Sequence, residues 1–174
     1  PMPTRVTFVV VETLMTPTND FASQAPFGKP TSSGFSLTVF FDDGTKITTY
    51  AGVDTVVYSI SSSTPGCGTV DNSVDRVTVS EGAIACSQVC VDASVQVGSR
   101  TFSVTDCSIV VHLAEVRTYM GAYPGGTSVI DTLVSTLYKM PCNSSTFEQG
   151  RLYTYATLSP TNEKKDITAS HMAY

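Results

Sequence analysis

Cysteine is the residue type in this sequence with the most distinctive chemistry. The chain has five cysteines: Cys67, Cys86, Cys90, Cys107 and Cys142. A thiolate zinc site usually contains pairs of cysteines separated by two residues, whereas three residues separate Cys86 from Cys90. Neither of the two histidines forms a partner pair with them. We therefore expect disulfides rather than a metal site.

The pairing of these cysteines is only partly constrained by their spacing. The first four allow three pairings. Cys86 and Cys90 lie in one predicted extended run, where their Cα atoms would be roughly 13 Å apart at about 3.3 Å per residue, so we do not expect them to bond each other. Between the other two pairings, we favour Cys86–Cys107 together with Cys67–Cys90. We expect Cys142 to pair beyond residue 174 or with another chain.

Asp42 and Asp43 are the acidic residues with the strongest claim to bind a metal ion. They precede Gly44, and hard cations such as Ca²⁺ prefer carboxylate oxygens. Asp-Asp-Gly is also typical of a tight turn, because Asp and Gly tolerate turn conformations. A similar segment later in the chain has Ser-Pro-Thr-Asn at 159–162, without carboxylates. We therefore expect a turn rather than a calcium site.

The two histidines do not form a recognisable catalytic arrangement. His112 lies in an alternating strand, and no Ser or Cys nucleophile lies in a recognisable elbow with it or with His171. We expect His112 to be a solvent-facing or hydrogen-bonded strand residue. The sequence thus predicts no catalytic, cofactor-binding or metal-binding residues.

Charge and hydropathy argue against nucleic-acid and membrane partners for this segment. The net charge is −5, and Lys and Arg do not cluster. The longest apolar run, Phe8 to Val11, is far too short to span a bilayer. A Ser- and Thr-rich acidic chain with cysteines, and with the glycosylation sequon that begins at Asn143, is typical of an extracellular or cell-surface protein.

The secondary structure that carries the cysteines, aspartates and histidines is predicted to consist of strands. β-branched residues are abundant, and no window has a sustained helical period. The Pro-rich segment from Met15 to Gly34 is predicted to be a long loop or a short edge segment, because Pro cannot donate a hydrogen bond to a strand ladder. We predict an all-β fold. The predicted strands cover residues 5–14, 35–41, 46–50, 55–60, 69–71, 77–79, 83–97, 102–104 and 108–116.

One strand–turn–strand phrase occurs almost twice in the sequence. The two copies are FSLTVFFDDGTKIT at 35–48 and LYTYATLSPTNEKKDIT at 152–168, and each has an Ile-Thr pair after its turn. Such a repeat predicts tandem β-modules. The segment 108–116 also resembles the opening segment 6–14. We therefore predict a first module at residues 1–113 that leads directly into a second, incomplete module at 114–174.

The order of steps in the first module resembles that of a known family. FSLTVFFDDGTKIT, VVYSISSS, GTVD, DRVTV, EGA and VCVDAS follow one another as in the second group of bacterial immunoglobulin-like repeats. Tyr58 takes the place of that family's core Trp, while the cysteines and the 15–34 insertion depart from its pattern. Similar cysteine-bearing repeats resemble those of very large protist and algal surface proteins, including the shaft proteins of flagellar hairs (mastigonemes).

The resemblance implies tandem Ig-like β-sandwich modules of about seven strands, without catalytic residues. It further implies a non-enzymatic structural repeat of a large extracellular rod, filament or cell-surface protein. The partners would be neighbouring modules and other chains of the assembly, joined through sheet edges and module junctions. The alternative is an adhesin or receptor ectodomain that binds through the 15–34 loop. A viral capsid or spike β-domain is a third hypothesis, which the internal repeat disfavours.

Overall fold

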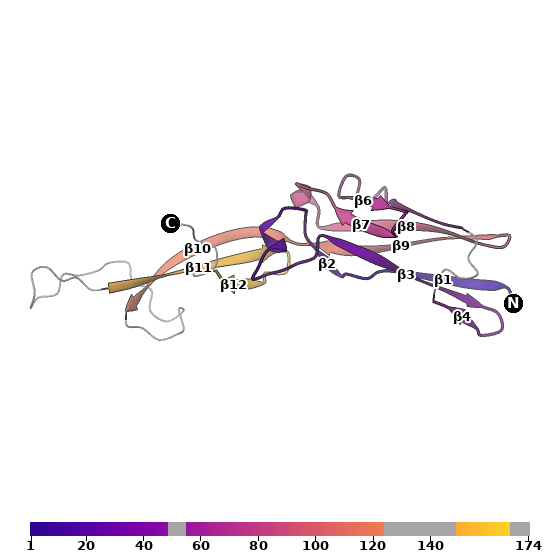
Figure 1. The fold of residues 1–174 in the computed structure, drawn as a ribbon, viewed down its shortest axis with the longest axis horizontal. Helices are drawn as coiled ribbons and strands as arrows, with labels where there is room; N and C mark the ends of the chain where they lie inside the picture. The colour runs from indigo at the N-terminus through magenta and orange to yellow at the C-terminus, as the bar shows by residue number, and fades with distance from the viewer. Residues whose placement is uncertain (49–54, 124–148, 168–174) are drawn as a thin grey trace, which may run out of the picture. The chain divides into compact units, whose positions relative to one another are not determined.

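Strands form nearly all of the regular structure in the described part of the chain, which covers residues 1–48, 55–123 and 149–167 of a computed structural model (Figure 1). The exceptions there are two 3₁₀ helices, η1 (Phe21–Ser23) and η2 (Ala83–Ala85). The predicted all-β class is therefore confirmed. The chain divides into two compact units, Pro1–His112 and Leu113–Tyr174.

The first unit contains two sheets. In the first sheet the strand order is β1 (Pro3–Val10), β3 (Ser32–Phe41), β7 (Arg76–Val79) and β6 (Gly68–Asp71), all antiparallel, and β4 (Lys46–Ile47) pairs with the end of β3. In the second sheet the order is β2 (Leu14–Met15), β9 (Arg100–Val110), β8 (Gln88–Val97) and β5 (Thr55–Ile60). Here β2 runs parallel to β9, and the other pairs are antiparallel.

Both sheets contribute alternate side chains to one shared hydrophobic core, as in a pair of sheets packed face to face. The alternation of Val and Ala along 89–97 predicts one apolar face, and these residues are indeed buried in β8. The first sheet contributes Val6, Phe8, Val10, Leu37, Val39, Val77 and Val79, and the second contributes Met15, Tyr58, Val89, Val91, Ala93, Val95, Val97 and Val110.

The predicted strand 5–14 is wrong as a single element, because the chain passes from one sheet to the other after Val10. The Val10 N–H donates to Asp106 Oδ2 at 2.8 Å, and the Glu12 N–H donates to Ser33 Oγ at 2.8 Å. Strand pairing resumes at Leu14, opposite Ile109 of β9. Side-chain acceptors thus satisfy the backbone where strand pairing is interrupted.

The predicted loop 15–34 is shorter than expected, because Met15 belongs to β2 and residues 32–34 belong to β3. Between them, the Thr16 N–H donates to the Pro30 carbonyl at 2.9 Å, and the Lys29 N–H donates to the Ala22 carbonyl at 2.8 Å. Ala22 and Phe27 are buried. The segment between β2 and β3 is therefore an ordered connection that is packed against the protein and has its own internal hydrogen bonds.

The second unit contains a three-stranded sheet with the order β10 (His112–Tyr123), β11 (Gln149–Ser159) and β12 (Lys164–Asp166). Thr154, Ala156 and Leu158 alternate along β11 and are buried, and Ile167 is buried just beyond β12. The Thr118 and Thr154 hydroxyls lie 3.0 Å apart and join β10 to β11.

The first copy of the repeated phrase forms the β3–β4 hairpin. The Phe41 N–H donates to the Thr45 carbonyl at 3.0 Å, and the Gly44 N–H donates to the Phe41 carbonyl at 3.2 Å. Gly44 has a φ of 83°, a left-handed conformation that glycine adopts without steric cost. The predicted Asp-Asp-Gly turn is therefore present.

The second copy forms the β11–β12 hairpin with the same closure. The Leu158 N–H donates to the Glu163 carbonyl at 2.9 Å, the Asn162 N–H donates to the Leu158 carbonyl at 2.8 Å, and Asn162 is left-handed with a φ of 57°. The second turn is one residue longer. When the left-handed residues are superposed, Ile47 corresponds to Lys165, so the predicted match between the two Ile-Thr pairs is wrong.

Three aromatic rings pack together in the first unit, with Phe8 and Tyr58 in the buried core and the half-buried Phe35 against it. The Tyr58 ring lies 4.4 Å from Phe35 and 5.6 Å from Phe8, centroid to centroid, and Phe8 lies 5.4 Å from Phe35. Tyr58 belongs to β5 of the second sheet, whereas Phe8 and Phe35 belong to the first. The cluster therefore joins the two sheets.

The side chain of Asn72, in the turn between β6 and β7, closes the outer edge of β5. The Tyr58 N–H donates to Asn72 Oδ1 at 2.8 Å, and Asn72 Nδ2 donates to the Tyr58 carbonyl at 3.0 Å. The amide thereby satisfies two backbone groups that an edge strand would otherwise present to other chains. It also links the second sheet to a turn of the first.

We expect Tyr58→Ala to lower the free energy of unfolding by about 3–5 kcal/mol, because it removes the ring that joins the two sheets and leaves a cavity. Val57→Ala, a change on the same strand at a side chain that is 52% exposed, should stay within about 0.5 kcal/mol. Urea unfolding followed by circular dichroism measures both. Equal losses in the two variants would contradict the proposed packing.

We expect Asn72→Ala to cost about 1–3 kcal/mol, from two hydrogen bonds worth about 0.5–1.5 kcal/mol each. Gln96→Ala, which loses one exposed bond to the Gly98 carbonyl, is the matched control. The uncovered edge of β5 should also increase self-association, measured by light scattering against concentration. An Asn72→Ala protein that matches the control in both measurements would show that this amide does not close the edge.

Candidate functional site

Two disulfides near one end of the second sheet are the most chemically distinctive feature of the described residues. Cys67 pairs with Cys86 and Cys90 pairs with Cys107, with Cα–Cα distances of 5.9 and 4.0 Å. The four predicted disulfide cysteines are therefore all bonded. The favoured pairing, Cys86–Cys107 with Cys67–Cys90, is wrong.

The pairing of Cys90 with Cys107 follows from the register of the β8–β9 hairpin. The two-residue Gly98-Ser99 turn places Val97 opposite Arg100, and each cysteine lies seven positions from its end of the turn. The turn was visible in the sequence. Counting equal distances from it would have identified this pair.

The backbone of Cys90 is directed away from Cys107. Its N–H donates to Thr64 Oγ1 at 3.0 Å, and its carbonyl accepts from the Ser61 N–H at 2.9 Å. Cys90 and Cys107 therefore form the closely spaced, non-hydrogen-bonded type of antiparallel pair. Their Cβ atoms leave the same face of the sheet, which suits a cross-strand disulfide.

Cys86 pairs with Cys67 because it does not belong to a strand. The predicted extended run 83–97 is wrong at its start, where η2 precedes Cys86 and β8 begins only at Gln88. The Cys86 N–H donates back to the Ala83 carbonyl at 3.1 Å, and the Ser80 N–H donates to the Cys67 carbonyl at 3.1 Å. These local turns bring the two cysteines together.

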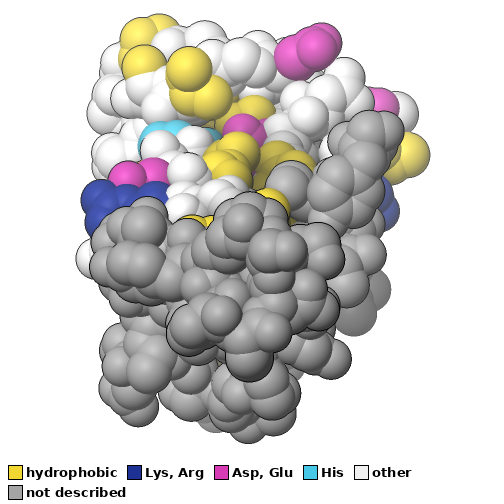
Figure 2. All heavy atoms as spheres, turned by 90° about the vertical axis from the view of Figure 1, so that its left-hand side faces the viewer, with side chains coloured by type: hydrophobic (Ala, Val, Ile, Leu, Met, Phe, Trp, Pro, Cys, Tyr) yellow, Lys and Arg dark blue, Asp and Glu magenta, His cyan; other side chains and the backbone are white. Residues whose placement is uncertain are grey.

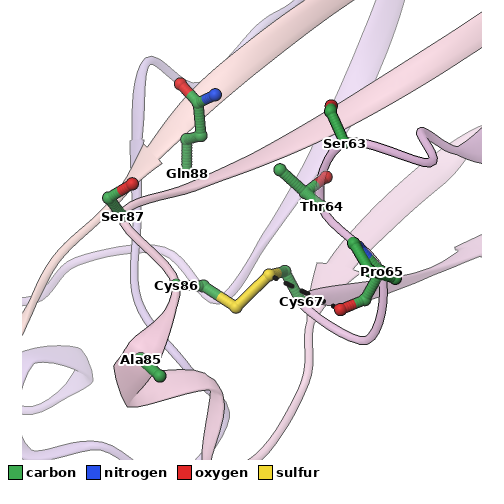
Figure 3. Close-up of a pocket in the computed structure, with 8 residues that line it drawn as sticks. All are labelled: Ser63, Thr64, Pro65, Cys67, Ala85, Cys86, Ser87 and Gln88. Atoms are coloured by element: carbon green, nitrogen blue, oxygen red, sulfur yellow. Dashed lines mark hydrogen bonds between the residues drawn. A yellow bond between two sulfur atoms is a disulfide. The ribbon is translucent and has the colours of Figure 1, made fainter.

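An open pocket of about 250 Å³ lies beside the Cys67–Cys86 disulfide (Figure 3). Four of its lining residues are polar, two are apolar and two form the disulfide, and none of the eight is charged. Thr64 Oγ1, in the lining, is already occupied by the Cys90 N–H. The lining residues are Ser63, Thr64, Pro65, Cys67, Ala85, Cys86, Ser87 and Gln88.

The two disulfides close loops of similar length, with sequence separations of 19 and 17. Loop-closure entropy gives each about 3 kcal/mol of stabilisation, because both loops are close to 15 residues. Their effects on the unfolded chain are therefore nearly equal. The differences between them lie in the folded state.

The Asp43 carboxylate accepts hydrogen bonds from Thr45 within its own turn. Its Oδ1 accepts from the Thr45 hydroxyl at 2.6 Å and from the Thr45 N–H at 2.9 Å, while Asp42 Oδ1 accepts from the Met2 N–H at 2.8 Å. The hydrogen bond from the Thr45 side chain, followed by that from its backbone, lowers the pKa of Asp43. Among the described residues, no three His, Cys, Asp or Glu side chains gather as a metal site.

Asp71 forms a second turn of the same kind, in the polar turn predicted between strands 69–71 and 77–79, although the sequence prediction did not single out this residue. Its Oδ1 accepts from the Ser73 hydroxyl at 2.6 Å and from the Ser73 N–H at 2.9 Å. The Ser73 side-chain bond is the main cause that lowers the pKa of Asp71. The spacing Asp-x-Thr or Asp-x-Ser, seen in both turns, was the available signal.

His112 begins β10, and its Nδ1 is buried without a hydrogen-bond partner among the described residues. The expectation of a solvent-facing or hydrogen-bonded histidine is therefore wrong for this atom. His171, Cys142 and Asn143 lie outside the described residues, so the expectations for them stay predictions.

Charged side chains of both signs lie near one another on the face shown in Figure 2, among the described residues visible there. On β10 the exposed Arg117 guanidinium pairs with Glu115, and this hydrogen bond is the main cause that raises the pKa of Arg117. On β12, Lys164 Nζ lies 4.5 Å from the centroid of the Tyr155 ring. Basic groups in this unit thus have local partners.

Comparison of the chain with known protein families, with curated proteins and with solved structures finds no match. Across the described residues, no helix combines the length and the hydropathy that a bilayer crossing requires.

We expect Thr45→Val to raise the pKa of Asp43, and Ser73→Ala to raise that of Asp71, because each removes the main hydrogen bond to the carboxylate. Each lowered pKa stabilises the fold above the unfolded pKa, and this contribution disappears as pH falls through the folded pKa. NMR titration of the carboxyl carbons measures both, and the untouched turn in each variant is the control. An unchanged pKa in both variants would refute this role for the hydroxyls.

Proposed function

We propose that this chain is a segment of a non-enzymatic structural protein built of tandem Ig-like β-sandwich modules. It would serve as a rod, filament or cell-surface stalk outside the cell, with neighbouring modules and other chains of the same assembly as its partners. The observation that carries the proposal is the structural repetition of the strand–turn–strand phrase.

The repetition supports the proposal at three levels. Each copy forms a hairpin, β3–β4 or β11–β12, and each hairpin is closed at a left-handed residue by the same pair of backbone hydrogen bonds. Each hairpin's first strand also has a neighbour on its other side, β1 or β10. Repetition of sequence, turn geometry and strand order is typical of tandem modules.

The strand order of the first unit also supports it. An immunoglobulin sandwich has strands A-B-E-D in one sheet and C-F-G in the other. With β1 as A, β3 as B and β7 as E, the orders β1-β3-β7-β6 and β9-β8-β5 correspond to those sheets. Tyr58 then lies on strand C, where such domains carry a buried Trp.

The connection between the two units is short. One residue, Val111, separates β9 from β10. It is fully buried, and its N–H donates to the Met15 carbonyl at 2.8 Å, so it is anchored in the first unit. A direct connection without a Gly- or Ser-rich linker supports modules in series rather than independently tethered domains.

An extracellular location is supported by the two disulfides, which persist in oxidising compartments. The packed 15–34 segment favours the structural function over the ligand-binding alternative, because Ala22 and Phe27 are turned into the protein. Asn72 satisfies two outward backbone groups of β5, both on Tyr58, so we place contacts with other chains at the other sheet edges and at the module junctions.

Sequencing the parent transcript on both sides of the region that encodes residues 1–174 tests the proposal. We expect further copies of the phrase at about the spacing seen here, each with a left-handed Gly or Asn at the turn. Electron microscopy of the native protein should show a beaded rod. Flanking sequence without further copies, or a single compact particle, would overturn the proposal.

A further inference from the structure

The two disulfides differ in the exposure of their cysteines. Cys107 lies on the outer face of the second sheet and is exposed, although its partner Cys90 is only 1% exposed. Cys67 is 6% exposed and Cys86 is half-buried. Thiol–disulfide exchange requires access to one sulfur. We therefore take the exposed Cys107 as the position for attack by a thiolate, ahead of the half-buried Cys86 that lines the pocket.

The strands that carry the Cys90–Cys107 bond do not depend on it for their pairing. Nine other residue pairs hold β8 to β9, on both sides of the two cysteines. The backbone of Cys90 is also held from the other side, by Thr64 and Ser61. Opening this bond therefore leaves the sheet in place and the two sulfurs adjacent. The Cys67–Cys86 bond, in contrast, joins two irregular segments.

We propose that Cys90–Cys107 is a reversible thiol-exchange site for low-molecular-weight thiols, with Cys107 as the sulfur that is attacked, while Cys67–Cys86 stays closed. The proposal does not depend on the structural function proposed above.

The atoms and electrons of the exchange balance with the attacking thiols alone, and no separate oxidant or reductant is needed. A thiolate attacks Cys107 Sγ, the bond between Cys107 Sγ and Cys90 Sγ breaks, and its electron pair leaves on Cys90 Sγ, which takes a proton from solvent. The product is a mixed disulfide at Cys107. A second thiolate can release the first as its own disulfide, and this completes a two-electron reduction. Alternatively, the Cys90 thiolate attacks Cys107 Sγ, restores the original bond and expels the thiol.

Equilibration of the folded chain in glutathione buffers, followed by alkylation and peptide mass spectrometry, tests the order of opening. Where Cys90–Cys107 is half reduced, we expect less than about a tenth of Cys67–Cys86 to be reduced, a difference of about 30 mV or more. The glutathione adduct should lie on Cys107 rather than Cys90. Earlier opening of Cys67–Cys86, or adducts mainly on Cys90, would overturn the proposal.

Two single variants form a matched pair for the accessibility of each sulfur. Cys90→Ser leaves the Cys107 thiol, and Cys107→Ser leaves the Cys90 thiol, in otherwise identical chains. We expect Cys107 to react with an aromatic disulfide reagent at least about tenfold faster than Cys90 under native conditions, and at a similar rate in urea. Peptide mapping distinguishes the label on Cys107 or Cys90 from any label on Cys142, which both variants retain. Equal native rates would contradict the proposal.

Discussion

The register of the β8–β9 hairpin is the constraint on which most of the first unit depends. A two-residue turn at Gly98 and Ser99 fixes it, and Gly98 has the positive φ of 59° that such a turn requires at its first position. A slip by one residue would move the apolar face of β8 out of the core. It would also separate Cys90 from Cys107. The apolar face of β8 and the cross-strand disulfide thus both follow from one short turn.

The all-β class and most strand positions could be predicted because they depend on local alternation. Val89 to Val97, for example, show the period of two that a half-buried strand requires. The break after Val10 could not be predicted in this way. It depends on Asp106, almost a hundred residues away, which accepts the Val10 N–H. Alternation gives the faces of a strand, but it does not say which sheet the strand joins.

The disulfide pairing also could not be predicted from alternation, although here the deciding residues lie close together in the sequence. The cysteine content correctly indicated disulfides, but the pairing was inferred from an extended run that includes Cys86. A 3₁₀ helix at 83–85 occupies the start of that run, so Cys86 lies before β8 and bonds to Cys67. The Asn72 amide on Tyr58 was missed for another reason. A side chain that closes a strand edge from a turn leaves no periodic signal in the sequence.

The two hairpins of the repeated phrase differ in length by one residue, yet both close at a left-handed residue. The extra residue lies between the residue whose N–H closes the turn, Phe41 or Leu158, and the left-handed position, outside the paired residues. Insertions at this point change no side-chain face, because the hydrogen bonds on either side reset the register. A hairpin of this kind can therefore gain or lose a turn residue while the same side chains of its strands stay buried. Its turn length and its core packing are thus independent properties of the sequence.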